Sequence, residues 1–198
     1  MAEVEYSAFL EYEAMKDKFD YMRLWGVDSK EDIAKTLAVF GAFTEGLQLF
    51  ASFAVLMNFP RQNRMKGMGQ IVTWSVRDET LHTESAIKLF KTFIEENPEV
   101  WNDKVKEEIT NACSTVIEHE DAFINLAFEL GGVKGMEADE VKQYIRYIAD
   151  RRLSQLGLPY LYNIEKNPLP WMDEMLNAVE HTNFFEGRAT EYSRAATT

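Results

Sequence analysis

Cysteine is almost absent from this sequence, and basic residues are in the minority. Cys113 is the one cysteine among 198 residues, so an internal disulfide is excluded. A single thiol fits a reducing compartment, and we expect a cytoplasmic protein in which Cys113 packs between helices. Lys and Arg number 21 against 33 Asp and Glu, which gives a formal net charge of −12. This balance, without a basic stripe, argues against nucleic-acid binding.

Proline and glycine are also scarce, with 5 and 10 residues, and they separate long segments of helical periodicity. The sequence contains no strand-like alternation, no internal repeat and no low-complexity tract. It therefore predicts an all-α fold, with helices over about 4–25, 30–58, 62–96, 99–130, 137–156 and 171–179. We expect a single helical domain over 1–181 and a flexible C-terminal tail over 182–198.

Local signals predict where several of these helices begin and end. Ser29 is a good N-cap for the second helix, with Asp32 as its capping-box partner. Pro60 is expected to stop the same helix, because proline restricts the residue before it. Pro98 is expected in the first turn of the fourth helix, which Gly131 and Gly132 end.

A membrane span is not favoured by this sequence. Its first residues, Met1 to Tyr6, are acidic and lack the apolar core of a signal peptide. The apolar stretch 36–59 is long enough to cross a bilayer, but it contains Glu45, Gln48 and Asn58. The chain also lacks the Lys/Arg bias of a membrane flank. We therefore expect a bundle helix here, and no membrane.

One acidic residue stands alone in that apolar stretch. Glu45 is the only charged residue between Lys35 and Arg61. We expect its carboxylate to be deeply buried, which is costly unless a proton, a partner or a metal compensates the charge. On the next helix Glu79 and His82 stand at i and i+3, so both project from one face. A Glu on one helix and Glu-x-x-His on its neighbour form half of a dimetal site in a helical bundle.

The donor atoms of these three residues suit iron and manganese, and one carboxylate can bridge two cations. Glu79 is expected to bridge the two cations. His82, one turn later on the same helix, is expected to bind one of the cations that Glu79 bridges. Asp78 is expected on a different face, where it accepts a hydrogen bond from a ligand imidazole or a nearby indole. Alone, Glu-x-x-His is a weak signal, and Glu45 alone fits a protonated acid or half of a salt bridge. The prediction rests on the presence of Glu45 and of the Glu79–His82 pair on two consecutive apolar helices.

The other histidines lack this context. His119 lies in an acidic stretch that we interpret as a solvated or packing face of the fourth helix. Glu118 or Glu120 is available there to complete a site, but neither forms a Glu-x-x-His with His119. We expect His181 to have a structural role.

Four further motifs follow in chain order: Ile148-Ala-Asp-Arg-Arg-Leu153, Asn167-Pro-Leu-Pro-Trp-Met172, His181-Thr-Asn-Phe-Phe-Glu186 and Thr190-Glu-Tyr192. Together with Glu45 and Arg77-Asp-Glu-x-x-His82, they make the sequence resemble the small (beta) subunit of class I ribonucleotide reductase over nearly the whole chain.

This resemblance implies a ferritin-like helical fold that usually forms a homodimer. It also implies a dinuclear iron or manganese/iron centre that reacts with oxygen species to make a stored oxidant, often a tyrosyl radical. The oxidant passes to the large (alpha) subunit, which reduces ribonucleoside diphosphates. Glu45, Glu79 and His82 match the second half of the family's ligands. Asp78 matches an acid that supports them, and Tyr192 resembles the tail tyrosine that relays the radical between subunits.

The chain also departs from the family pattern. The first ligand half, an Asp or Glu followed by a Glu-x-x-His, is absent, and so is the helix of the radical tyrosine. Both would lie upstream of residue 1. The acidic extension that grips the large subunit is missing after Thr198. We therefore expect the C-terminal part of a beta subunit, inactive alone, that a complementing N-terminal segment or a second chain completes.

Two other interpretations stay open from the residues themselves. Three ligands alone also fit another ferritin-like dimetal protein, such as an oxidase or monooxygenase component. The missing ligand half also fits a non-catalytic helical fragment that complements a second polypeptide. The Asn-Pro-Leu-Pro-Trp turn and the Thr-Glu-Tyr tail favour the reductase over both.

Overall fold

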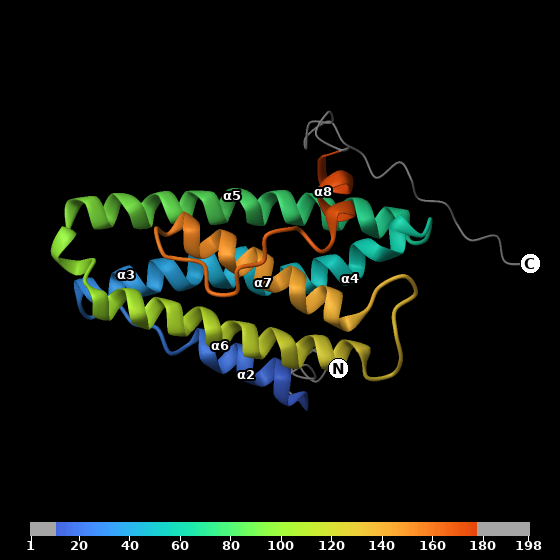
Figure 1. The fold of residues 1–198 in the computed structure, drawn as a ribbon, viewed down its shortest axis with the longest axis horizontal. Helices are drawn as coiled ribbons and strands as arrows, with labels where there is room; N and C mark the ends of the chain where they lie inside the picture. Colours follow the sequence, from blue (N-terminus) through green and yellow to red (C-terminus); the bar gives the residue numbers. More distant parts are fainter. Residues whose placement is uncertain (1–10, 178–198) are drawn as a thin grey trace, which may run out of the picture.

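The computed structural model describes residues 11–177, which form a bundle of helices without a named β-strand (Figure 1). This confirms the all-α prediction. In chain order the elements are α2 (Glu13–Met22), α3 (Lys30–Ala38), η2 (Val39–Gln48), α4 (Phe50–Arg61), α5 (Lys66–Glu96), η3 (Pro98–Val100), α6 (Asp103–Phe128), α7 (Ala138–Gln155) and α8 (Pro170–Asn177). The predicted domain end at residue 181 and the predicted tail over 182–198 lie outside the described residues.

The long helices run side by side along one axis (Figure 1). α5, green in the figure, packs along α3, η2 and α4, and a tight turn connects it to α4. α7 packs on η2, α4 and α6, while α2 packs on α6. The core between them is made of large apolar side chains, among them Phe43, Leu47, Met57, Phe90, Ile109, Ile117, Ile145 and Leu153.

The predicted second helix is a single rod of three helical segments. Its middle segment, η2, is a π-helix of 10 residues with wider i→i+5 turns, which the sequence prediction missed. The expected stop before Pro60 is also wrong, because α4 includes Pro60 and ends at Arg61. Gly69 on α5 makes room for the proline ring, since a Cβ there would lie 2.6 Å from Pro60 Cγ.

Hydrogen-bonding caps explain where α3 and α6 start. Ser29 is the N-cap of α3, as predicted, and its hydroxyl accepts from the Asp32 N–H at 3.1 Å. Pro98 begins the short 3₁₀ helix η3 and not α6, which was expected to start there. α6 starts after Asn102, whose side-chain oxygen accepts from the Val105 N–H at 3.0 Å. Asparagine is a strong N-cap because it satisfies such an unpaired N–H.

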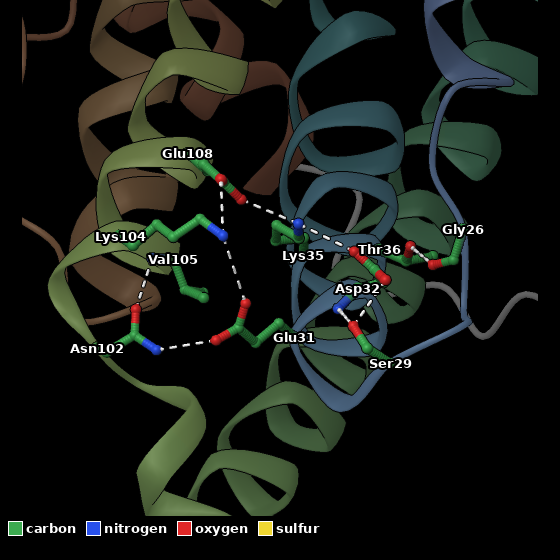
Figure 2. A network of polar contacts seen from close by, with 10 residues as sticks. All are labelled: Gly26, Ser29, Glu31, Asp32, Lys35, Thr36, Asn102, Lys104, Val105 and Glu108. Carbon is green, nitrogen blue, oxygen red and sulfur yellow. Dashed lines mark hydrogen bonds and ion pairs between the residues drawn. The ribbon is translucent and has the colours of Figure 1, made fainter.

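A network of charged residues ties the start of α3 to the start of α6 (Figure 2). Lys35 Nζ lies 2.9 Å from Glu108 and 3.0 Å from Asp32, and these contacts raise the pKa of Lys35. Lys104 lies 3.8 Å from Glu31. Isolated surface pairs contribute little to stability, but Lys35 is largely buried and shared by two acids. The network therefore fixes this end of the bundle.

One stretch of the described residues, Lys30–Arg61, is long and apolar enough to cross a membrane by length and composition alone. In the fold, 61% of its apolar window is buried against other helices, as in the core helix of a bundle.

Cys113 is also buried, and burial raises the pKa of its thiol to about 12. Both features agree with the packing roles expected from the sequence.

Candidate metal centre

Three predicted ligands meet at one place between η2 and α5. Glu45, Glu79 and His82 each offer a ligand atom, and these atoms all lie within 4.8 Å of one another. Glu45 comes from η2, and the other two stand one turn apart on α5, with His82 Nδ1 3.5 Å from Glu79 Oε2. The helices that carry them are direct neighbours.

The donor set fits an iron or manganese ion. Two carboxylates and one imidazole supply oxygen and nitrogen, which are the ligands that these metals take in proteins. A cation within reach of the three side chains would still have coordination positions to fill, because such ions commonly take more than three ligands. The described residues contain one such group of His, Cys, Asp and Glu, and it is this triad.

The triad opens into a cavity of about 550 Å³. Its other lining residues come from α2, η2, α4 and α6: Met15, Lys18, Phe19, Met22, Thr44, Gln48, Leu49, Ser52 and Phe123. Glu45 is half-buried, so the expectation of deep burial is wrong, and His82 is 48% exposed. The reason is that η2 turns Phe43 and Leu47 into the core, while Glu45 faces the cavity.

Asp78 lies beside the triad, on the side of α5 that His82 occupies. Its carboxylate is 66% exposed, and Oδ1 lies 3.7 Å from His82 Nε2. The expectation of a different face is therefore wrong, because i and i+4 side chains share a face. The separation is longer than a hydrogen bond. His82 thus has Glu79 near one ring nitrogen and Asp78 near the other, which is the arrangement that orients a ligand imidazole.

Sequence reasoning missed a buried ion pair at the edge of the cavity. Glu120 on α6 is 0% exposed, and its Oε1 lies 2.5 Å from Lys18 Nζ on α2. Burial raises the pKa of Glu120 to about 7, against the opposing effect of Lys18. The signal was available, because Glu120 continues the spacing of the buried residues Val116, Ile117 and Ile124.

Among the remaining predicted residues, His119 is not brought to this site. His119 is half-buried on α6 with its ring edge-on to Tyr21, 5.2 Å between ring centres, and burial lowers its pKa. This agrees with a packing role for His119. Tyr192 and His181 lie outside the described residues, so their predicted roles stay predictions.

Comparison with known proteins matches the ribonucleotide reductase small-chain family over residues 2–168. The chain is 44% identical to the probable ribonucleoside-diphosphate reductase small subunit of Invertebrate iridescent virus 3, over all of this chain and 57% of that protein. It is 36% identical to the ribonucleoside-diphosphate reductase subunit beta of Chlamydia pneumoniae, over 86% of this chain and 50% of that protein. The chain thus spans little more than half the length of these relatives.

A solved structure of a related protein has the same fold. The ribonucleotide reductase R2 subunit from Clostridium botulinum superposes with a TM-score of 0.79 at 20% identity, over 88% of this chain and 56% of that chain. At this identity the likeness shows the fold alone, and it confirms the predicted ferritin-like helical bundle.

Proposed function

This chain belongs to the ribonucleotide reductase small-chain family, and we propose that it supplies one half of that subunit's dimetal site. The observation that carries the proposal is the convergence of Glu45, Glu79 and His82 within 4.8 Å at the edge of a cavity. When bound, a dinuclear iron or manganese/iron centre would supply the oxygen-activating redox chemistry. The subunit's reaction is then radical transfer to a large (alpha) subunit that reduces ribonucleoside diphosphates.

The protein's own residues have distinct tasks in this proposal. Glu45 and Glu79 would bring two negative charges to the cations, and carboxylates of this kind suit iron and manganese. His82 binds through one ring nitrogen. Asp78 Oδ1 lies 3.7 Å from His82 Nε2, so its carboxylate would orient the ring by attracting the remaining N–H.

The other ligands come from helices that cover the open side of α5. That side carries exposed residues at helical spacing along the length of the helix: Ile71, Ser75, Asp78, His82, Ser85 and Leu89. Two members of this row, Ile71 and Leu89, are exposed apolar residues. We propose that a complementing N-terminal segment or a second chain packs here and brings the first ligand half. Tyr192 then relays the radical towards the large subunit.

Metal binding to the isolated chain tests the half-site. We expect at most one Mn²⁺ ion, bound weakly, in equilibrium dialysis, because three protein ligands do not complete a dinuclear site. Glu79→Gln should lower the affinity at least about tenfold, since a lost charge-assisted contact is commonly worth more than one kcal/mol. Glu95→Gln, an exposed acid on the same helix, is the matched control and should bind as the unmodified chain does.

Other results would point to other functions. Two tightly bound ions per chain, without any partner, would contradict the half-site. No binding, even with the complementing segment present, would indicate a non-catalytic helical fragment. Metal binding with oxygen consumption but no ribonucleoside diphosphate reduction, with the large subunit present, would favour a different dimetal oxidase or monooxygenase component.

A further inference from the structure

A buried arginine on α7 makes its main polar contact with the backbone of η2. Arg152 is 4% exposed, and its Nε donates to the Gly46 carbonyl oxygen at 2.8 Å, across 106 residues of sequence. Its Nη1 donates to Gln155 Oε1 at 2.9 Å, and the guanidinium lies 5.6 Å from the ring centre of Phe50. No carboxylate among residues 11–177 forms an ion pair with Arg152.

Such a cation is costly to bury without an acid. Burial lowers the pKa of Arg152 to about 10, so the guanidinium still carries its charge at neutral pH. Its hydrogen bonds go to the neutral acceptors Gly46 and Gln155, while the Glu84 carboxylate favours the charge without forming an ion pair. The contact with Gly46 is the one that links Arg152 to the π-helical segment.

The contact lies where the two ligand-bearing helices touch. A Cβ at Gly46 would lie 2.7 Å from Arg152 Nε and 2.8 Å from Thr83 Cγ2, so only glycine admits both neighbours. Gly46 directly follows Glu45 in the chain, and Thr83 directly follows His82. One point of close packing thus joins α7, η2 and α5 next to two of the three ligands.

The π-helical turn decides where Glu45 points. A π-helix closes its hydrogen bonds at i→i+5, so each residue advances less around the axis than in an α-helix. If η2 relaxed to an α-helix, Glu45 would rotate relative to Glu79 and His82. A donor from another helix that holds a carbonyl within η2 opposes this change, and Arg152 is such a donor, with a shorter contact than that of Lys18 to the Gln48 carbonyl.

We propose that Arg152 is a positioning residue: its hydrogen bond to the Gly46 carbonyl holds the π-helical turn that aims Glu45 at Glu79 and His82. This rests on the proposed metal binding by the three ligands. Arg152 does not itself line the cavity. Its effect is therefore carried by the backbone of η2.

Arg152→Gln in the full chain tests the inference with two measurements. The first is amide hydrogen exchange without metal, in which we expect faster exchange over residues 39–49 and unchanged exchange in α6. The second is Mn²⁺ affinity, which we expect to fall about tenfold, the effect of losing roughly one charge-assisted hydrogen bond. Arg151→Gln, which removes the exposed neighbouring arginine, should match the unmodified chain in both.

The two measurements separate this inference from the proposed function. If the unmodified chain binds no Mn²⁺, alone or complemented, the proposed metal site fails. If that chain binds Mn²⁺ and Arg152→Gln binds it equally well, Arg152 has only a structural role and the inference is overturned.

If Arg152→Gln does not fold, the same two measurements on Arg152→Lys test the inference. It keeps the charge but cannot reproduce both arginine hydrogen bonds. Lower Mn²⁺ affinity together with faster exchange confined to 39–49 supports the inference, and unchanged values in either measurement overturn it.

Discussion

Lys18 Nζ lies 2.5 Å from Glu120 Oε1, and the same lysine lines the cavity that the three candidate ligands share. The ammonium group also donates to the Gln48 carbonyl at 3.4 Å and lies 4.7 Å from the ring centre of Phe123. This one side chain therefore connects α2 to both η2 and α6. It also places a positive charge on the wall of the cavity that Glu45 and Glu79 line.

Glu120 is expected to make stability depend on pH. Burial raises its pKa from 4.5 to about 7, so the folded chain keeps a proton that the unfolded chain releases. The contribution of this protonation to the free energy of unfolding is complete below pH 4.5, and it is lost as the pH rises through about 7. In Glu120→Gln, the free energy of unfolding from urea titrations should fall less between pH 5 and pH 8. The exposed Glu118→Gln should keep the original decline, and an equal decline in all three proteins would refute the assignment.

Gly41 is expected to be intolerant of a methyl group, because a Cβ there would overlap Ala86 Cβ on α5. Gly41→Ala should lower the free energy of unfolding by about 1–3 kcal/mol, the usual cost of overpacking. Adding Ala86→Gly should recover part of this loss, with a coupling above about 0.5 kcal/mol in a double-mutant cycle. Gly132→Ala is the control, since a Cβ there meets nothing within 4 Å. Strict additivity of the two changes would show that η2 and α5 are not in contact at this point.

Asp150 is expected to hold the segment after α7 in place. Its carboxylate accepts the backbone N–H groups of Leu161, Tyr162 and Ile164 at 2.8 to 3.0 Å, and the residue is buried. Asp150→Asn replaces one acceptor oxygen with a donor, so at least one buried N–H loses its partner, at a cost of about 1–3 kcal/mol. In this variant, hydrogen exchange at the amides of Leu161, Tyr162 and Ile164 should become faster. Asp139→Asn, at an exposed position on the same helix, should change neither measurement.

Tyr192→Phe tests the proposed relay in the tail. The substitution keeps the ring and removes the hydroxyl whose proton must leave when the phenol is oxidised. In a complex with the complementing segment and the large subunit, we expect nucleotide reduction to be abolished while metal loading stays normal. Tyr160→Phe, which removes an exposed tyrosine hydroxyl outside the tail, should remain active. Full turnover by Tyr192→Phe would leave this residue as ordinary surface.

The convergence of the three candidate ligands was predictable because it follows from local geometry and chain order. Glu79 and His82 share a face on any α-helix. Glu45 lies on the preceding helix, and consecutive helices joined by a short turn pack as neighbours. The lone charge of Glu45 in an apolar stretch identified its position, although not its degree of burial.

The missed features depend on contacts between distant parts of the chain. The π-helical segment accompanies a contact with Arg152, more than 100 residues later. The partner of Glu120, Lys18, lies on α2, about 100 residues earlier, although the helical spacing already indicated that Glu120 is buried. The start of α6 was misplaced because Pro98 is also a good first residue for a short 3₁₀ helix, and Asn102 then provides the stronger cap. Helical periodicity carries no information about such partners.

The two sides of the cavity differ in how firmly they are held. η2 and α5 pack closely at Gly41 and Gly46, where an added Cβ would meet Ala86 and Thr83 of α5, so the wall that carries the three candidate ligands is tightly packed. The opposite wall is α2, and none of its ten residues is buried. The cavity therefore has one closely packed wall and one wall of partly exposed side chains. The buried link between Lys18 and Glu120 is the contact that ties this second wall to α6.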